Sequence, residues 1–285
     1  MRGMPEQTDV VIIGAGATGL TAAKTLVDAG REVVVLEARN RVGGRLLTEQ
    51  RDGHYVEMGG QWLAPYQEAA LAMAKELGIE EFVRPRGGAD VYVSTDGQRK
   101  THAHEQLPLD AEGVAEVDRI LDALDQITKA VDPDDPWTHP QAAELDGITF
   151  DAWLRAQSSH QEAVAAVGKI VAAFMTKDTV QFSVLGAAWL AATSGGVSHL
   201  ADADEVLNSR LVGGLSQIPL RLAERLGDRV RLNSAVRTVR WSDDGVVVET
   251  ADGEVSARTA ILAVPPNLLS SMQFDPPLPS WRMTM

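Results

Sequence analysis

The chain of 285 residues contains no cysteine, which excludes disulfides and thiolate metal sites. It also has no apolar run long enough to cross a bilayer. Its first residues, MRGMPEQTD, lack the apolar stretch of a secretory signal. We therefore expect a soluble, cytoplasmic protein with no membrane partner.

Positive charge is scarce, with 26 Lys and Arg against 40 Asp and Glu, for a net charge of −14. This balance argues against nucleic acid as a partner. An acidic surface can draw in cationic molecules, although most such surfaces serve only solubility. With 45% hydrophobic residues, the chain can bury the core of one large domain or two modest ones.

Motifs of hydrolases and metal sites are missing as well. His102 and His104 would share one face of a strand, but no third ligand follows at a recognisable spacing, so we expect no metal. No serine lies in a nucleophile-elbow context, so a hydrolase triad is not supported. The sequence identifies no catalytic side chain in this chain.

The most informative segment begins with a glycine turn between a strand and a helix. Gly14, Gly16 and Gly19 form G-x-G-x-x-G directly after the apolar run Val10–Ile13, and Ala17 opens the helix that follows. In this motif the glycines allow a tight turn, the approach of a pyrophosphate and close packing of helix on strand. Phosphates favour the N-terminus of such a helix because its N–H groups are free. A glycine turn between a strand and a helix can also serve only the packing of the two elements, without binding a ligand.

An acidic residue strengthens the dinucleotide interpretation. Glu37 follows the second strand, Glu32–Leu36, where a carboxylate can accept hydrogen bonds from both ribose hydroxyls. A 2′-phosphate would be repelled at this position, which disfavours an NADP-type ligand. The order strand, turn, helix, strand and acid therefore predicts a dinucleotide site.

A second glycine turn follows immediately, in the run Arg39–Arg45. Gly43 and Gly44 let the backbone fold against a cofactor, and Arg45 can pair with a pyrophosphate. The alternative is a surface turn with solvated arginines. The run EARNRVGGR after the first turn resembles the FAD-binding signature of the flavin-dependent amine oxidases, of the monoamine and putrescine oxidase type.

The resemblance extends along most of the chain and implies the site residues. The run Glu57–Trp62 is similar to the segment that passes the flavin ring, Phe182–Gly196 to the border of the substrate cavity, and Arg210–Gly214 to the return into the cofactor domain. The implied cofactor contacts are Gly14, Gly16, Ala17, Gly19, Glu37, Ala38, Arg39, Gly43, Gly44, Arg45, Gly59, Gly60, Gln61, Trp62, Val236 and Ala263. The implied substrate-pocket residues are Trp62, Phe174, Leu200 and Leu207.

The expected fold class is α/β, with a Rossmann-like FAD-binding domain interrupted by a mostly helical α+β substrate domain. The FAD-binding domain comprises residues 1–83 and 211–285, and the substrate domain residues 84–210. Short β runs at Val236–Trp241, Val246–Thr250 and Glu254–Ala257, joined by Asp-Gly turns, predict an antiparallel meander leading into the strand Thr259–Val264. Helices are expected at Thr18–Ala29, Glu68–Leu77, Ala111–Val131, Phe150–Gln157, Gln161–Thr176, Val180–Thr193 and Leu215–Leu226.

The resemblance covers only the N-terminal portion of the family's sequence. The family's C-terminal portion carries a second flavin-contacting segment, an aromatic pair and a lysine near flavin N5, none of which has a match here. We therefore expect a second polypeptide, either a separate gene product or a cleavage product, to complete the fold. FAD is expected to be held non-covalently, since this chain offers no cysteine for a thioether.

The resemblance implies oxidation of an amine. A hydride would pass from the amine Cα to flavin N5, the imine would be hydrolysed, and oxygen would reoxidise the flavin to give hydrogen peroxide. Amino-acid oxidases of the wider family tend to place an arginine after the paired glycines, whereas Gln61 and Trp62 stand here. An amine without a carboxylate is thus the expected substrate, the alternative being that an arginine elsewhere in the chain binds a carboxylate. Two alternatives remain: a flavin desaturase or protoporphyrinogen-oxidase-like enzyme, and a flavin-binding scaffold without turnover.

Overall fold

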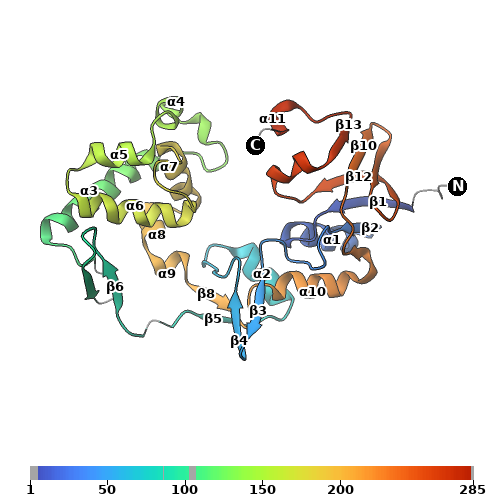
Figure 1. The fold of residues 1–285 in the computed structure, drawn as a ribbon, viewed down its shortest axis with the longest axis horizontal. Helices are drawn as coiled ribbons and strands as arrows, with labels where there is room; N and C mark the ends of the chain where they lie inside the picture. Colours follow the sequence, from blue (N-terminus) through green and yellow to red (C-terminus); the bar gives the residue numbers. More distant parts are fainter. Residues whose placement is uncertain (1–5, 86, 103–106, 284–285) are drawn as a thin grey trace. The chain divides into compact units, whose positions relative to one another are not determined.

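The computed structural model describes residues 6–85, 87–102 and 107–283. Two compact units make up the chain, and we call them the sheet unit and the helical unit (Figure 1). The sheet unit consists of Met1–Leu63, Gln67–Phe82 and Ser209–Met285, and the helical unit of Ala64–Tyr66 and Val83–Asn208. These divisions rest on compactness, so the cofactor and substrate roles assigned to the expected domains stay predictions.

A mixed seven-stranded sheet forms the centre of the sheet unit, in the order β13-β10-β11-β12-β1-β2-β9. Strand β1 runs parallel to β2 on one side and to β12 on the other, as in a doubly wound fold. Strands β10, β11 and β12 form an antiparallel meander. The strands are β1 (Glu6–Ile13), β2 (Val33–Leu36), β9 (Val230–Arg231), β10 (Thr238–Ser242), β11 (Gly245–Glu249), β12 (Glu254–Leu262) and β13 (Gln273–Asp275).

One expectation about the meander is wrong. The runs Glu254–Ala257 and Thr259–Val264, expected as separate strands, form the single strand β12. Its first part pairs antiparallel with β11, while almost its whole length pairs parallel with β1. Alternating residue types in a sequence indicate a strand, but they do not show that one strand pairs with a different neighbouring strand on each side.

The two faces of the sheet carry separate cores, because successive side chains of a strand point to opposite faces. Ile12, with Val33 and Val35, packs beneath the helices, whereas Val11 and Ile13 pack against the meander. The helices of this unit are α1 (Ala17–Asp28), α2 (Glu68–Glu76), α10 (Gln217–Leu226) and α11 (Ser280–Met283), with 3-10 turns at Gly227–Arg229 and Pro266–Ser271. Smaller strand pairs are β3 (Thr48–Arg51) with β4 (His54–Glu57), and β5 (Glu81–Val83) with β8 (Ser209–Leu211).

The helical unit packs its helices around a single apolar core. Phe150 is fully buried there and stacks on Trp153 and Phe182, with ring centroids 5.6 and 5.4 Å away. The helices are α3 (Ala111–Thr128), α4 (Ala142–Asp146), α5 (Phe150–Gln157), α6 (Gln161–Met175), α7 (Val184–Thr193), α8 (Val197–Ala201) and α9 (Ala203–Val206), with a 3-10 turn at Pro136–Thr138. A hairpin of β6 (Asp90–Val93) and β7 (Arg99–His102) completes the unit, and His104 lies outside the described residues.

Helix α7 begins four residues later than its sequence pattern predicts, at Val184 rather than Val180. The backbone before Val184 pairs with another segment instead of forming helix, because the Phe182 carbonyl accepts a hydrogen bond from the Phe150 N–H at 2.9 Å. Ser183 then caps the helix through its side chain. The apolar pattern therefore extends beyond the helix into a segment that packs against α5.

Candidate functional site

The first glycine turn is built on contacts that exclude side chains. Gly14 has a φ of +107°, and a Cβ there would lie 2.7 Å from the carbonyl oxygen of Ala263. A Cβ on Gly19 would lie 2.0 Å from the carbonyl oxygen of Gly14. At Gly16, by contrast, the nearest atom to an added Cβ is the Gly44 Cα, 3.9 Å away. Two of the glycines therefore serve close packing, and the third faces free space.

Helix α1 begins at this turn without a side-chain cap on its first N–H groups from any residue that the structure describes. Within the described residues, no acidic residue lies in its first turn. Gly16 occupies the N-cap position. Such an N-terminus attracts an anion, because its N–H groups and the helix dipole both point toward it.

Glu37 joins the first turn to the strand that precedes the second. Its side chain is buried, at 8% exposure. One carboxylate oxygen accepts a hydrogen bond from the Ala15 N–H at 2.8 Å, and the other accepts one from the Arg39 N–H at 2.9 Å. Each oxygen keeps a second lone pair that can accept from a hydroxyl. Glu37 can therefore hold the backbone in place and still accept a hydrogen bond from a ribose. The sequence did not reveal its structural role.

The second glycine turn lies directly against the first. The Gly43 N–H donates to the Ala15 carbonyl at 2.8 Å, and Gly16 and Gly43 form a parallel bridge. The Arg41 guanidinium holds this turn in shape by donating to the carbonyl oxygens of Gly44 at 3.0 Å and Val42 at 3.1 Å. Sequence reasoning singled out Arg45, whose side chain is exposed, and missed Arg41. The available signal was a third arginine in the run Arg39–Arg45, between the two that were predicted as cofactor contacts.

The predicted segment Glu57–Trp62 lies beside the chain that leaves the second glycine turn. The Met58 N–H donates to the Leu47 carbonyl at 2.7 Å, and the Gly60 N–H to the Arg45 carbonyl at 3.3 Å. Trp62 is half-buried, and the guanidinium carbon of Arg210 lies 5.3 Å from the centre of its ring. The structure thus brings the two glycine turns and this segment together in the sheet unit.

The other predicted positions divide between the two units. In the sheet unit, Ala263 follows β12 and donates its N–H to the Ile13 carbonyl, while Val236 packs on the meander side of the sheet. Ala38, Arg39, Gly59 and Gly60 are exposed there. In the helical unit, Leu200 is 2% exposed within the core and Phe174 packs against that core, whereas Leu207 is half-buried.

No metal cluster emerges from the described part of the chain, where no three His, Asp or Glu side chains are placed to hold an ion. Among the described helices, none is both long and apolar enough to span a bilayer.

A mixed sheet with two adjoining glycine turns and a buried acid after the second strand is an α/β arrangement consistent with a Rossmann-like FAD-binding domain. The family model for flavin containing amine oxidoreductases matches residues 17–285, so the chain belongs to this family. The putrescine oxidase of Kocuria rosea is 43% identical over 96% of this chain and 60% of its own length. Human amine oxidase B is 32% identical over 99% of this chain and 55% of its own length.

Solved structures agree with this membership. A structure of wild-type putrescine oxidase bound to putrescine matches with a TM-score of 0.93 and 43% identity, over 97% of this chain and 62% of its own. Cyclohexylamine oxidase from Brevibacterium oxydans IH-35A matches with a TM-score of 0.91 and 30% identity, over the same shares of the two chains. The chain therefore spans about 60% of the length of the relatives it matches, and they correspond to it with their N-terminal part.

Proposed function

We propose that this chain is the cofactor-binding, N-terminal part of an FAD-dependent amine oxidase, and that it holds FAD non-covalently. The observation that carries the proposal is the open N-terminus of α1 facing two glycine turns that are bonded to each other. Its residues fit the cofactor: the space at Gly16 suits a diphosphate, and Glu37 keeps acceptor capacity for a ribose. The proposed contacts are those that the resemblance implies, from Gly14 to Ala263.

Bound FAD would supply the capacity to accept two electrons, which no side chain of this chain provides. The chain's own residues position the reactants and exclude water. Gln61 and Trp62, both half-buried, would border the flavin. Because neither residue is cationic, these two side chains offer no charged partner for a substrate carboxylate. We therefore propose an amine without a carboxylate as substrate, in the chemical class of the putrescine bound by the relative.

The part of the oxidase fold that this sequence does not span is proposed to complete the sheet unit, since the relatives are longer by about two fifths of their length. The sheet unit has an open apolar groove of about 670 Å³, lined among others by Ala22, Leu63, Ala70, Met73 and Ile261. An apolar surface of this kind normally needs a cover. The C-terminal portion of the oxidase fold is the occupant that we propose for it.

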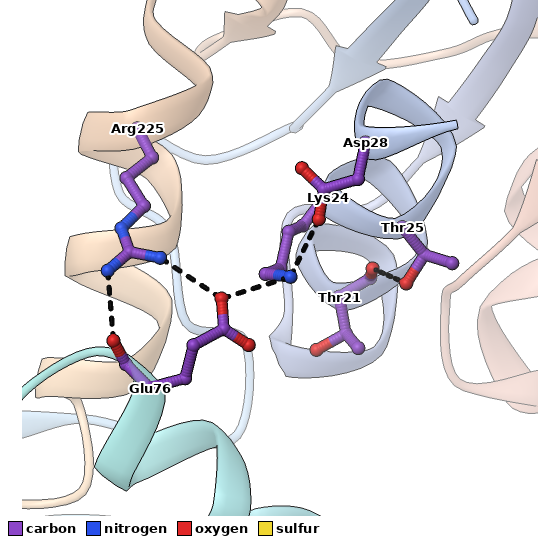
Figure 2. Close-up of polar contacts among 6 residues, drawn as sticks. All are labelled: Thr21, Lys24, Thr25, Asp28, Glu76 and Arg225. Atoms are coloured by element: carbon purple, nitrogen blue, oxygen red, sulfur yellow. Dashed lines mark hydrogen bonds and ion pairs between the residues drawn. The ribbon is translucent and has the colours of Figure 1, made fainter. Parts of the chain in front are cut away.

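Polar contacts hold the helices around this groove. Figure 2 shows Glu76 of α2 accepting from Lys24 of α1 at 3.0 Å and from Arg225 of α10 at 3.2 Å. Lys24 also pairs with Asp28 on its own helix, and these contacts raise the pKa of Lys24. The three helices that contribute to the lining of the groove, α1, α2 and α10, are therefore tied to one another.

The purified protein, with any chain that accompanies it, tests the proposal directly. Native mass spectrometry is expected to show bound FAD and to report whether a second polypeptide accompanies the protein, and anaerobic putrescine is expected to bleach the flavin. Peroxide should form when air is admitted. A yellow protein that no amine reduces would favour the scaffold alternative, and reduction by a non-amine substrate alone would favour the desaturase or protoporphyrinogen-oxidase-like one.

Glu37→Gln tests the site within this experiment, with the exposed Glu32→Gln as its matched control. Loss of a charged hydrogen-bond acceptor is expected to weaken FAD binding by about 1.5–3 kcal/mol, measured by flavin titration. Equal affinity for FAD in both variants would remove Glu37 from the site.

A further inference from the structure

Glu57, the last residue of β4, connects two segments that are distant in the sequence. One oxygen of its carboxylate accepts a hydrogen bond from the Leu215 N–H at 2.6 Å. The other accepts one from the Thr48 hydroxyl at 2.5 Å. Thr48 and Ser216 exchange two further bonds, from the Thr48 N–H to Ser216 Oγ at 2.8 Å and from the Ser216 N–H to Thr48 Oγ1 at 3.3 Å. We call Thr48, Glu57, Leu215 and Ser216 the Glu57 clamp.

The clamp acts on backbone groups that precede a helix. Leu215 and Ser216 come directly before α10, where N–H groups lack intrahelical acceptors. A carboxylate is favoured beside such groups, because its hydrogen bonds are charge-assisted and the helix dipole attracts it. Leu215 and Ser216 are buried, so their N–H groups need acceptors from the protein.

A second anchor lies at the other end of the same segment. Leu63 and Ser209 form a bridge, with the Leu63 N–H donating at 2.9 Å and the Ser209 N–H at 3.0 Å. Next to this bridge, the Trp62 ring faces the Arg210 guanidinium. Residues 58–62 are therefore fixed at both ends against residues 209–216. Between these anchors the Gly60 N–H reaches the Arg45 carbonyl, directly after the second glycine turn.

We propose that Glu57 is a positioning residue of the flavin site. Its carboxylate fixes the path of Gly59–Trp62 past the glycine turns, and by doing so it sets how tightly the chain holds flavin. This inference rests on the proposed function, because it takes FAD as the occupant of the site. Glu49 of the facing strand β3 supplies a matched control, since it pairs with Arg51 on the exposed side of the hairpin.

The test compares the full chain, with any polypeptide that accompanies it, to Glu57→Ala, Glu57→Gln and Glu49→Ala. Amide hydrogen exchange is measured in peptides covering residues 57–63 and 212–218, without added FAD, and FAD affinity is measured by flavin fluorescence titration. In Glu57→Ala, loss of a charged bond is expected to speed exchange and weaken FAD binding, each on the order of tenfold. Glu57→Gln should restore most of both, because its amide oxygen still accepts from Leu215 and its NH₂ group can donate to Thr48.

Each outcome decides the proposal. Amide hydrogen exchange in Glu57→Ala at the wild-type rate would show that the Glu57 clamp does not hold the segment. Faster exchange with unchanged FAD affinity would mean that Glu57 has only a structural role. Thr48→Val keeps the side-chain shape and removes the hydroxyl, so it repeats the test with an intermediate effect if Glu57→Ala fails to fold. If wild type itself takes up no FAD, the proposed function fails. If wild type binds FAD and the Glu57 variants bind it with the same affinity, this inference fails alone.

Discussion

Helices α1 and α7 differ in how the first turn of each is completed. Helix α7 receives a side-chain cap, because Ser183 Oγ accepts from the Gly186 N–H at 3.1 Å. Helix α1 has Gly16 at the same position and receives no side-chain cap from the residues that the structure describes. The two helices therefore start differently, one with a side-chain cap from the chain itself and one without such a cap from the described residues, and the uncapped start is the one that we propose for the cofactor.

The same contrast holds between α1 and the longer helices of the helical unit. There, side chains of Asp110, Thr149 and His160 cap α3, α5 and α6, as Ser183 caps α7, whereas the short helices α4 and α8 have no side-chain cap within the described part of the chain. In the sheet unit, the glycine turns are held by backbone bonds and by the long reach of Glu37 and Arg41. Capped helices around an apolar core stabilise a scaffold, whereas exposed N–H groups beside close backbone contacts suit an anionic cofactor.

Two glycines at the third position of these helices provide the sharpest test. Gly19→Ala in α1 would place a Cβ 2.0 Å from the Gly14 carbonyl oxygen, whereas Gly186→Ala in α7 meets its nearest atom, Ser183 Oγ, at 3.5 Å. Gly19→Ala is expected to prevent the glycine turn from forming and to destabilise the sheet unit by more than about 3 kcal/mol. Gly186→Ala is expected to be neutral or to stabilise by about 0.5–1 kcal/mol.

Urea unfolding, with hydrogen exchange resolved by unit, measures both variants. Equal effects of the two alanines would show that the turn adjusts freely and would end the distinction between the two helix starts.

A buried aromatic residue tests the scaffold side of the comparison. Phe150→Ala removes a fully buried ring from the stack with Trp153 and Phe182, and it is expected to destabilise the helical unit by about 3–5 kcal/mol. Trp137→Ala is the control, because that side chain is 65% exposed and its loss should change stability by less than about 0.5 kcal/mol. Thermal unfolding monitored by circular dichroism compares the two. A stable Phe150→Ala protein would mean that this core does not depend on its aromatic stack.

The sequence predicts those parts of the structure that depend on neighbouring residues. The motif around Gly14 and the strand before Glu37 gave the order of the first elements, and the meander followed from its Asp-Gly turns. The run Glu57–Trp62 was singled out, but the contact of Glu57 with Leu215 was not predicted, because Leu215 lies 158 residues further along the chain and offers a backbone N–H. Any residue type provides such a group, so no short pattern reveals the contact.

Removing the side-chain cap of α7 and adding one to α1 measures a smaller effect. Ser183→Ala is expected to cost the helical unit about 1 kcal/mol, since the Gly186 N–H loses its acceptor. Gly16→Ser should stabilise the cofactor-free sheet unit by only about a few tenths of a kcal/mol, because serine is a slightly better N-cap than glycine. The same substitution is expected to weaken FAD binding, since its side chain enters the space beside Gly44. Improved FAD binding by Gly16→Ser would contradict the assignment of that space to the diphosphate.

The smallest expected effect depends on pH and concerns the hairpin of the helical unit. The Tyr92 hydroxyl donates to Glu162 of α6 at 2.6 Å, and the Thr95 N–H donates to the same carboxylate at 2.8 Å. Burial and this bond raise the pKa of Tyr92 to about 12, while hydrogen bonds from Thr95 and Tyr92 lower the pKa of Glu162. A raised pKa contributes stability that is present below pH 10 and is lost toward pH 12. A lowered pKa contributes stability that is present above about pH 4.5 and is lost as the pH falls.

The hairpin is therefore expected to be held most firmly between these limits. Since Glu162 lies near solvent, the change at either limit should stay below about 1 kcal/mol. Tyr92→Phe removes the titrating hydroxyl and should abolish the alkaline limb, while the acid limb persists through Thr95. Hydrogen exchange of residues 90–102 across the pH range, corrected for intrinsic rates, measures both limbs. An alkaline limb that survives in Tyr92→Phe would assign it to another group, and the contact with α6 would then not be what holds the hairpin.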